Sequence, residues 1–213
     1  MTIRVLFLGE GTSDSGIIPQ IEVVAARLGV DIAVTDPDLG RLPKPPGRAV
    51  SDKLRAVLDI DGEYELIAVH RDADRDGRQA RLAEIVSAIR AHAPGTAHAA
   101  IVPVRMTEAW LLMDEVELRT VAGNPNGRIG LNLPSPNRVE SVPDPKSVLK
   151  EKLALASGLS GRKLEKFNQR FSQHRRLLLE RIDPFGPIAD VPSWQHFVAD
   201  MESGLQSACG SVH

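Results

Sequence analysis

Apolar residues follow two different periods along the first half of the chain. Short apolar runs predict buried β-strands at residues 3 to 9, 31 to 35, 64 to 70 and 97 to 104. Apolar residues spaced three or four apart predict helices at residues 14 to 28, 49 to 58 and 78 to 91. Strands that alternate with helices indicate βαβ units. We therefore expect an α/β fold, a largely parallel, Rossmann-like sheet flanked by helices.

The pattern changes after residue 121. Residues 122 to 145 are rich in Pro and Asn and predict a long loop with little regular structure. Helical periods return at residues 146 to 156, 162 to 181 and 192 to 206. This organisation predicts an α/β domain at 1 to 121, the loop, and a helical extension at 146 to 213 packed on the same domain.

The strand at 64 to 70 is followed by three aspartates at alternate positions, Asp72, Asp74 and Asp76, and then by Gly77. Asp and Gly are common in turns, so a solvated loop is one interpretation. An EF-hand loop is another, but its twelfth position is Ala83, where a bidentate Glu is needed, and a strand replaces its first helix. The third interpretation is a site for a hard cation.

Two further acids follow other strands, Glu10 after the first and Glu108 after the fourth. The carboxyl ends of parallel strands meet at one edge of a sheet, where α/β proteins bind ligands. Glu10, the Asp72/Asp74/Asp76 group and Glu108 are therefore expected at the same edge. Carboxylate oxygens suit Mg²⁺ or Mn²⁺, so this convergence favours a metal site over turn chemistry.

Basic residues lie both near these acids and far along the chain. Those near the acids are expected to hold a phosphate group or to balance the acids in ion pairs: Arg71, Arg75, Arg78 and Arg105. Residues 146 to 181 contain ten Lys and Arg against three Glu. On their helices, the following side chains are expected either to follow a nucleic-acid backbone or to form a solvated face: Arg162, Lys163, Lys166, Arg170, Arg175, Arg176 and Arg181.

The overall composition excludes several classes of protein. Hydrophobic residues make up 42% and charged residues 25%, as in ordinary globular domains, and the net charge of −2 does not by itself indicate nucleic-acid binding. The one cysteine, Cys209, cannot build a disulfide framework, which fits a cytoplasmic protein. The first apolar run is too short for a signal peptide or a membrane span. The Gly9-Glu10-Gly11 stretch lacks the third glycine of a dinucleotide site and the lysine of a Walker loop.

The motifs at Gly9-Glu10-Gly11-Thr12-Ser13-Asp14 and Asp72-Ala73-Asp74 resemble those of TOPRIM domains, which occur in topoisomerases, primases and nucleases of the overcoming-lysogenization-defect type. The segments Val102-Pro103-Val104 and Thr107 to Asp114 resemble the RloB-like branch, often encoded beside an ABC/SMC-type ATPase in defence loci. The resemblance covers about residues 3 to 115. It implies that Glu10 acts as general acid/base or metal ligand and that Asp72 and Asp74 bind Mg²⁺ or Mn²⁺. Asp76 and Glu108 are candidates for binding a second metal or for orienting the first.

Three functions follow as hypotheses. The first is a cytoplasmic, metal-dependent nuclease that acts on nucleic acid, expected to be DNA, in phage defence with an ATPase partner. The second is a non-catalytic TOPRIM-like accessory subunit that binds the ATPase or nucleic acid. The third is a small-molecule phosphotransferase or phosphatase, which is less favoured because its D-x-D normally follows the first strand. His70 is expected to make a structural hydrogen bond, and Trp110 is expected in the core.

Overall fold

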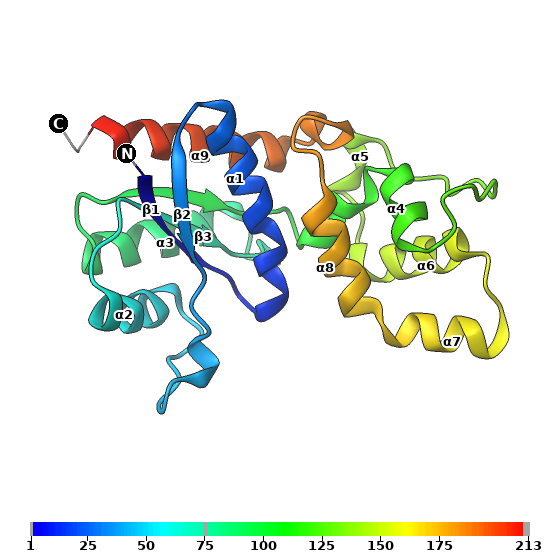
Figure 1. Cartoon of the computed structure of the whole chain (residues 1–213), viewed down its shortest axis with the longest axis horizontal. Helices are drawn as coiled ribbons and strands as arrows, with labels where there is room; N and C mark the ends of the chain where they lie inside the picture. Colours follow the sequence, from blue (N-terminus) through cyan, green and yellow to red (C-terminus); the bar gives the residue numbers. More distant parts are fainter. Residues whose placement is uncertain (1, 75, 211–213) are drawn as a thin grey trace.

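The central element is a parallel sheet, seen in the computed structural model that describes residues 2–74 and 76–210 (Figure 1). Within these residues the sheet has four strands in the order β2-β1-β3-β4. Their bounds are Thr2–Leu8 for β1, Asp31–Thr35 for β2, Leu66–His70 for β3 and Ala97–Ile101 for β4. All three strand pairings are parallel. The expected α/β class is confirmed.

Helices cover both faces of this sheet. On one face lie α1 (Ile18–Arg27) and α9 (Pro192–Gly210), and on the other lie α2 (Val50–Asp61) and α3 (Arg78–His92). Since side chains alternate across a strand, the two faces carry different apolar sets. Residue Phe7 of β1 packs in the cluster that contains α1 and α9, and its neighbour Leu6 packs with α2 and α3. Burial on both faces explains the continuous apolar runs of the sequence.

Short 3₁₀ helices follow β1 and β2, η1 at Thr12–Ile17 and η2 at Leu39–Arg41. The helices between β4 and α9 form a helical part beside the sheet, on the right in Figure 1. Its elements are η3 (Thr107–Leu112), α4 (Glu115–Val121), α5 (Pro136–Val139), α6 (Pro145–Ser157), α7 (Gly161–Gln169), α8 (Phe171–Arg181) and η4 (Pro187–Asp190). Trp110 is buried here, as expected, with its ring edge-on to Trp194 at 4.9 Å between centroids. Its indole Nε1–H donates to Ser193 Oγ at 2.8 Å. The helical part and one face of the sheet share one hydrophobic core.

The second half differs from its sequence-based prediction in three places. The helix expected at 162 to 181 is wrong as a single element, because the chain turns at Arg170 between α7 and α8. The strand expected at 97 to 104 ends at Ile101, and the 3₁₀ helix η3 follows at Thr107. The loop at 122 to 145 contains α5 and buries Leu131 and Val139 completely. Tertiary burial of apolar side chains organises this segment despite its prolines.

Membrane-spanning helices are absent from the part of the chain that is described: none there has both the length and the apolar character to cross a bilayer.

Candidate functional site

The strand order places a topological switch point between β1 and β3. The chain passes from β1 to β2 on one side and then returns to β3 on the other side of β1. In open α/β sheets, ligands bind outside the carboxyl ends of the strands at such a point. Glu10 follows the end of β1 by two residues, and Asp72 follows the end of β3 by two residues. Both acids are therefore at the position where this fold binds ligands.

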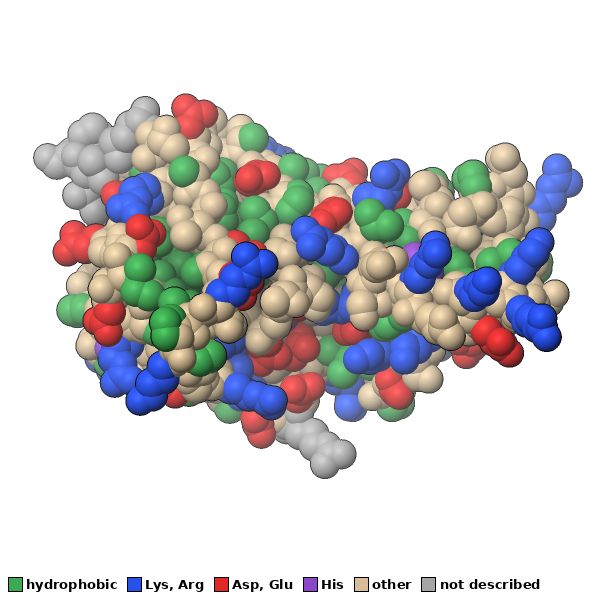
Figure 2. Space-filling view, turned by 60° about the horizontal axis from the view of Figure 1, so that its bottom comes forward, with side chains coloured by type: hydrophobic (Ala, Val, Ile, Leu, Met, Phe, Trp, Pro, Cys, Tyr) green, Lys and Arg blue, Asp and Glu red, His purple; other side chains and the backbone are tan. Residues whose placement is uncertain are grey.

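A cleft of about 370 Å³ opens at this point. In the Figure 2 view, acidic side chains gather near the middle of the face, with Lys and Arg side chains on both sides. The cleft is bounded by residues from the loop after β1, the ends of β3 and β4, and the helical part: Glu10, Gly11, Ser13, Asp14, Asp72, Met106, Glu108, Lys146, Phe171, Ser172 and Arg175. The structure thus brings Glu10, Asp72 and Glu108 to one cleft. These are the acids that follow three different strands and that were expected at the same edge of the sheet.

His70 is buried at the end of β3 and joins two carboxylates of the cleft. Its Nδ1 lies 3.2 Å from Asp14 Oδ2, and its Nε2 lies 3.4 Å from Asp72 Oδ1. Burial alone would lower the pKa of His70, but the hydrogen bonds and charges of both aspartates raise it to about 10. A protonated imidazole donates from both nitrogens. It therefore fixes Asp14 and Asp72 relative to each other, the structural role expected from the sequence.

The carboxylate of Asp14 accepts hydrogen bonds from four donor groups. Its Oδ2 accepts from the backbone N–H groups of Glu10 and Gly11, both at 3.0 Å, and from His70. Its Oδ1 accepts from Arg175 at 3.2 Å. Burial would raise the pKa of Asp14, yet bonds to His70 and Gly11 and the charges of His70 and Arg175 hold that pKa well below its usual range. Asp14 is thus an anion that shapes the loop bearing Glu10.

Arg175 reaches the cleft from α8, on the helical part. Its Nε donates to Glu108 at 3.0 Å and its Nη1 to Ser13 Oγ at 2.7 Å. Its Nη2 donates to Asp14 and to Thr107 Oγ1, each at 3.2 Å. The guanidinium is buried, with an exposed side-chain fraction of 10%. Arg175 was expected on a solvated or phosphate-binding face, and the structure instead uses it to connect the helical part to the edge of the sheet.

Glu10 and Asp72 each have one oxygen held by the protein. Glu10 Oε1 pairs with Arg71 Nη1 at 2.7 Å, and Asp72 Oδ1 accepts from the N–H of Thr107 at 3.2 Å. Within residues 2–74 and 76–210, their second oxygens accept no hydrogen bond. Burial raises the pKa of Glu10; Arg71 lowers it, and the charge of Asp72 raises it again. These two side chains thus retain free oxygen donors beside one cleft.

The other two aspartates do not line the cleft. Asp74 is exposed with a φ of 46°, and its N–H donates to Arg105 O at 3.0 Å. Asp76 Oδ2 pairs with Arg81 Nη2 at 2.9 Å and its side chain is 60% exposed. Among the described residues, no group of three or more His, Cys, Asp or Glu is placed to hold a metal ion. Mg²⁺ commonly takes only one or two protein carboxylates and keeps its waters. Glu10 and Asp72 fit that requirement.

Comparison with known protein families, with curated proteins and with solved structures finds no match. The resemblance to TOPRIM domains therefore rests on the short motifs around Glu10 and Asp72. The parallel sheet that bears these motifs is shown by the structure. The TOPRIM assignment itself stays a prediction.

The expected phosphate-binding arginines have different surroundings. Arg71 is in ion pairs with Glu10 and Glu84, and Arg78 lies 3.8 Å from Asp200. Arg105 is exposed. Arg75 lies outside the described residues. Of the three arginines in this group that the structure describes, only Arg71 directly contacts a carboxylate that lines the cleft.

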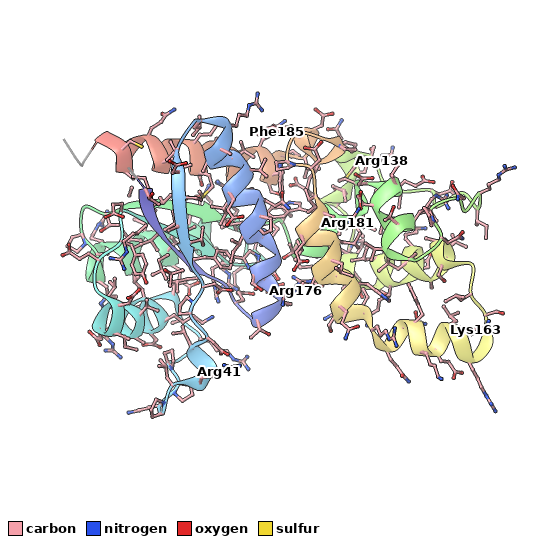
Figure 3. The ribbon with its side chains drawn as sticks, in the orientation of Figure 1. Arg41, Arg138, Lys163, Arg176, Arg181 and Phe185 are labelled. Carbon is pink, nitrogen blue, oxygen red and sulfur yellow. The ribbon has the colours of Figure 1, made fainter. Side chains whose placement is uncertain are left out.

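The basic residues of α7 remain without acidic partners. Arg162, Lys163, Lys166 and Arg170 are exposed and form no ion pair within the described part of the chain. Figure 3 places Lys163 at the outer end of the helical part. The helix directly precedes α8, whose Phe171, Ser172 and Arg175 line the cleft. A surface of uncompensated positive charge therefore leads to the carboxylates.

Proposed function

We propose that the cleft hydrolyses phosphodiester bonds of nucleic acid with the help of Mg²⁺ or Mn²⁺. The observation that supports this most directly is the pair formed by Glu10 and Asp72 at the switch point of the sheet. Each carboxylate has one oxygen anchored by a protein donor and one free, on the edge of a single cleft. Carboxylates held in this way are preorganised for a hard cation, since their orientation does not have to be established on binding.

The chain's own groups suit this chemistry. A divalent cation, when bound, offsets the charge of the phosphate and makes water a stronger nucleophile. Asp72 is oriented by Thr107 and His70. Burial raises the pKa of Glu10, which suits its carboxylate to accept a proton from an attacking water. Lys146 and Arg175, from the helical part, add positive charge to the lining of the cleft.

The basic face of α7 supports a polymeric substrate. Unpaired Lys and Arg side chains attract a phosphate backbone regardless of sequence. Arg162, Lys163, Lys166 and Arg170 lie on α7 or directly after it and outside the lining of the cleft, so only a ligand that extends beyond the cleft would contact them. DNA rather than RNA, the ABC/SMC-type ATPase partner and a role in phage defence rest on the resemblance alone.

Cleavage by matched carboxylate variants tests this proposal. Purified wild type is expected to nick plasmid DNA or cut oligonucleotides in Mn²⁺ or Mg²⁺. Glu10→Gln and Asp72→Asn should lower the rate at least about 100-fold, as loss of a general base or of an electrostatic group does. Asp76→Asn, which changes an exposed carboxylate outside the cleft, is the control and should retain the rate. Full activity in both cleft variants would contradict the proposal.

One observation favours a non-catalytic accessory subunit instead. Three acids of the cleft already have cationic partners, because Arg175 contacts the buried Asp14 and Glu108 and Arg71 contacts the partly exposed Glu10. Such a cluster is also what a purely structural connection would need. The two functions separate in the same assay. Absence of cleavage in Mg²⁺ and Mn²⁺, with nucleic-acid binding unchanged in Glu10→Gln and Asp72→Asn, would support the accessory role.

A further inference from the structure

A second pocket of about 390 Å³ lies on the other side of Glu10, between the end of β1 and the Pro-rich loop at residues 36 to 48. We propose that this pocket binds one nucleoside unit of the nucleic acid, with its base against the apolar wall and its phosphate toward Glu10. The inference rests on the proposed function and names the part of the substrate that lies next to the cleaved phosphate. Neither the TOPRIM resemblance nor the motifs around the cleft imply this pocket.

The pocket has the composition of a small-molecule site. Its apolar lining comes from the end of β1 and from the loop: Phe7, Leu8, Pro37, Leu39, Pro45 and Pro46. Proline rings are rigid, so they offer a wall that loses little freedom when a flat ligand packs on it. Ligand pockets of a few hundred Å³ combine such apolar walls with a few polar groups that fix orientation. A planar base with a polar edge fits this description.

The acidic side chains of the pocket favour a ligand with N–H donors, whereas its two cations, Arg48 and Lys53, suit a phosphate. Asp36 and Asp38 line it, and Asp38 is already paired with Arg41 Nε at 2.8 Å. Asp36 has neither a hydrogen bond nor an ion pair within the described residues. A carboxylate accepts two parallel hydrogen bonds, and guanine presents two adjacent N–H donors on its Watson–Crick edge. Among the bases, guanine is therefore expected to bind best.

The two pockets are connected at one position of the chain. Glu10 and Gly11 line both of them. A Cβ atom built on Gly11 would meet no atom within 4 Å, so there is open space beside this shared residue. A nucleoside in the second pocket would therefore have its phosphate beside Glu10. This continuity, together with α7 on the far side of the cleft, is what favours a nucleotide over an unrelated apolar ligand.

Calorimetric titration in EDTA tests the inference without any metal-dependent step. The probes are guanosine 5′-monophosphate, uridine 5′-monophosphate, ribose 5-phosphate and inorganic phosphate. Wild type should bind the guanosine nucleotide at least about 10-fold more tightly than ribose 5-phosphate. Asp36→Asn should weaken the guanosine nucleotide at least about 10-fold and the uridine nucleotide by less than about 3-fold. Each tenfold change corresponds to about 1.4 kcal/mol.

Two further variants guard against effects on folding. Gly40→Phe places an aromatic ring at the pocket's edge, where a Cβ meets only Asp38 Oδ1 at 3.4 Å, and should also weaken the guanosine nucleotide. Ile60→Phe changes a side chain that is 67% exposed near the end of α2, outside the lining of the pocket, and should leave binding unchanged. The inference is overturned if ribose 5-phosphate binds as tightly as the nucleotide, or if Asp36→Asn and Gly40→Phe both bind like wild type.

The result separates from that of the cleavage assay. Nucleotide binding as expected, without cleavage in any metal, would overturn the nuclease and leave a nucleotide-binding pocket. Cleavage that depends on Glu10 and Asp72, with no selective nucleotide binding, would overturn the pocket and leave the nuclease.

Discussion

At the scale of single residues, His70 shows how burial and charge compete in this protein. A buried imidazole is normally neutral, because the charged form loses its hydration. Here Asp14 and Asp72 lie against its two nitrogens at 3.2 and 3.4 Å. Their combined effect exceeds that of burial and raises the pKa of His70 to about 10, above the ordinary value of 6.5. The native state therefore binds a proton that the unfolded chain releases near neutral pH.

This difference predicts a dependence of stability on pH. Because the folded pKa of His70 is raised, its stabilising contribution is fully present below about pH 6.5 and is lost as the pH rises through 10. The loss can reach about 1.4 kcal/mol per pH unit in that window. His70→Gln should be less stable than wild type at pH 6 and should lack this loss. Urea unfolding at pH 6, 8 and 10 measures how the free energy of unfolding changes with pH in wild type and in His70→Gln.

His98→Gln, a change of an exposed histidine on β4, is the control for this experiment and should keep the wild-type slope. If stability changes with pH equally in wild type and His70→Gln, the buried imidazole of His70 does not hold its proton.

At the scale of elements, α7 and α8 differ in burial although their sequence is continuous. None of the side chains of α7 is buried, whereas α8 buries Phe171, Arg175 and Leu178. The prediction of one helix at 162 to 181 missed this break because the sequence around Arg170 contains neither Gly nor Pro, the residues that usually mark the end of a helix. After the turn, α8 packs against the 3₁₀ helix at Thr12–Ile17, which follows β1. The turn leaves α7 free to present its basic face.

That basic face predicts a salt-dependent contribution to nucleic-acid binding. Lys166→Glu should weaken binding of a DNA duplex. The negative slope of log affinity against log salt should become shallower by about one, as it does when one phosphate contact is lost. Arg90→Glu is the matched control, since Arg90 is also exposed and without an ion pair in the described residues but lies on α3. Titration of fluorescent duplex DNA at several salt concentrations gives both quantities. Equal slopes in the two variants would exclude α7 from the interface.

The sequence predicted the sheet and the edge that bears the candidate site, but it did not predict which side chains contact the acids at that edge. Long apolar runs identified β1 and β3, and the parallel order followed from the alternation with helices. Glu10, Asp72 and Glu108 could be placed together for the same reason. Asp74 and Asp76 could not be separated from Asp72, because alternate positions after a strand indicate a shared direction only while the chain remains extended. The chain turns at Asp74, where φ is positive.

The contribution of Arg175 was not foreseeable from local pattern alone. One signal was present, since Arg175 occupies the same helical stripe as Phe171, Leu178 and Leu179, which are buried. A charge within an apolar stripe indicates a buried partner. The partners Asp14 and Glu108 are 161 and 67 residues away in sequence, and only the folded chain brings them together.

At the scale of the whole molecule, this arginine joins the two halves at the cleft. Arg175→Met keeps much of the side-chain volume but leaves Glu108 buried without its cation and leaves Asp14 with His70 as its one remaining cation among the described residues. Removal of one partner from a buried ion pair costs about 3–5 kcal/mol in comparable sites. Arg176→Met, in the next position, removes an exposed pair with Glu180 and should cost at most about 1 kcal/mol. Denaturant unfolding of both variants measures the difference.

The double variant Arg175→Met/Glu108→Gln shows whether the destabilisation comes from the lost contacts of Arg175 or from a buried carboxylate without a cation. If the cost arises from uncompensated carboxylates, neutralising Glu108 should recover part of the stability lost in Arg175→Met, and the two changes should not be additive. If the single variants at 175 and 176 unfold alike, the guanidinium does not hold the halves together. In that case the shared hydrophobic core around Trp110 and Trp194, together with the hydrogen bond from Gln20 Nε2 to Leu179 O, would have to position α8, and with it α7, beside the carboxylates of the cleft.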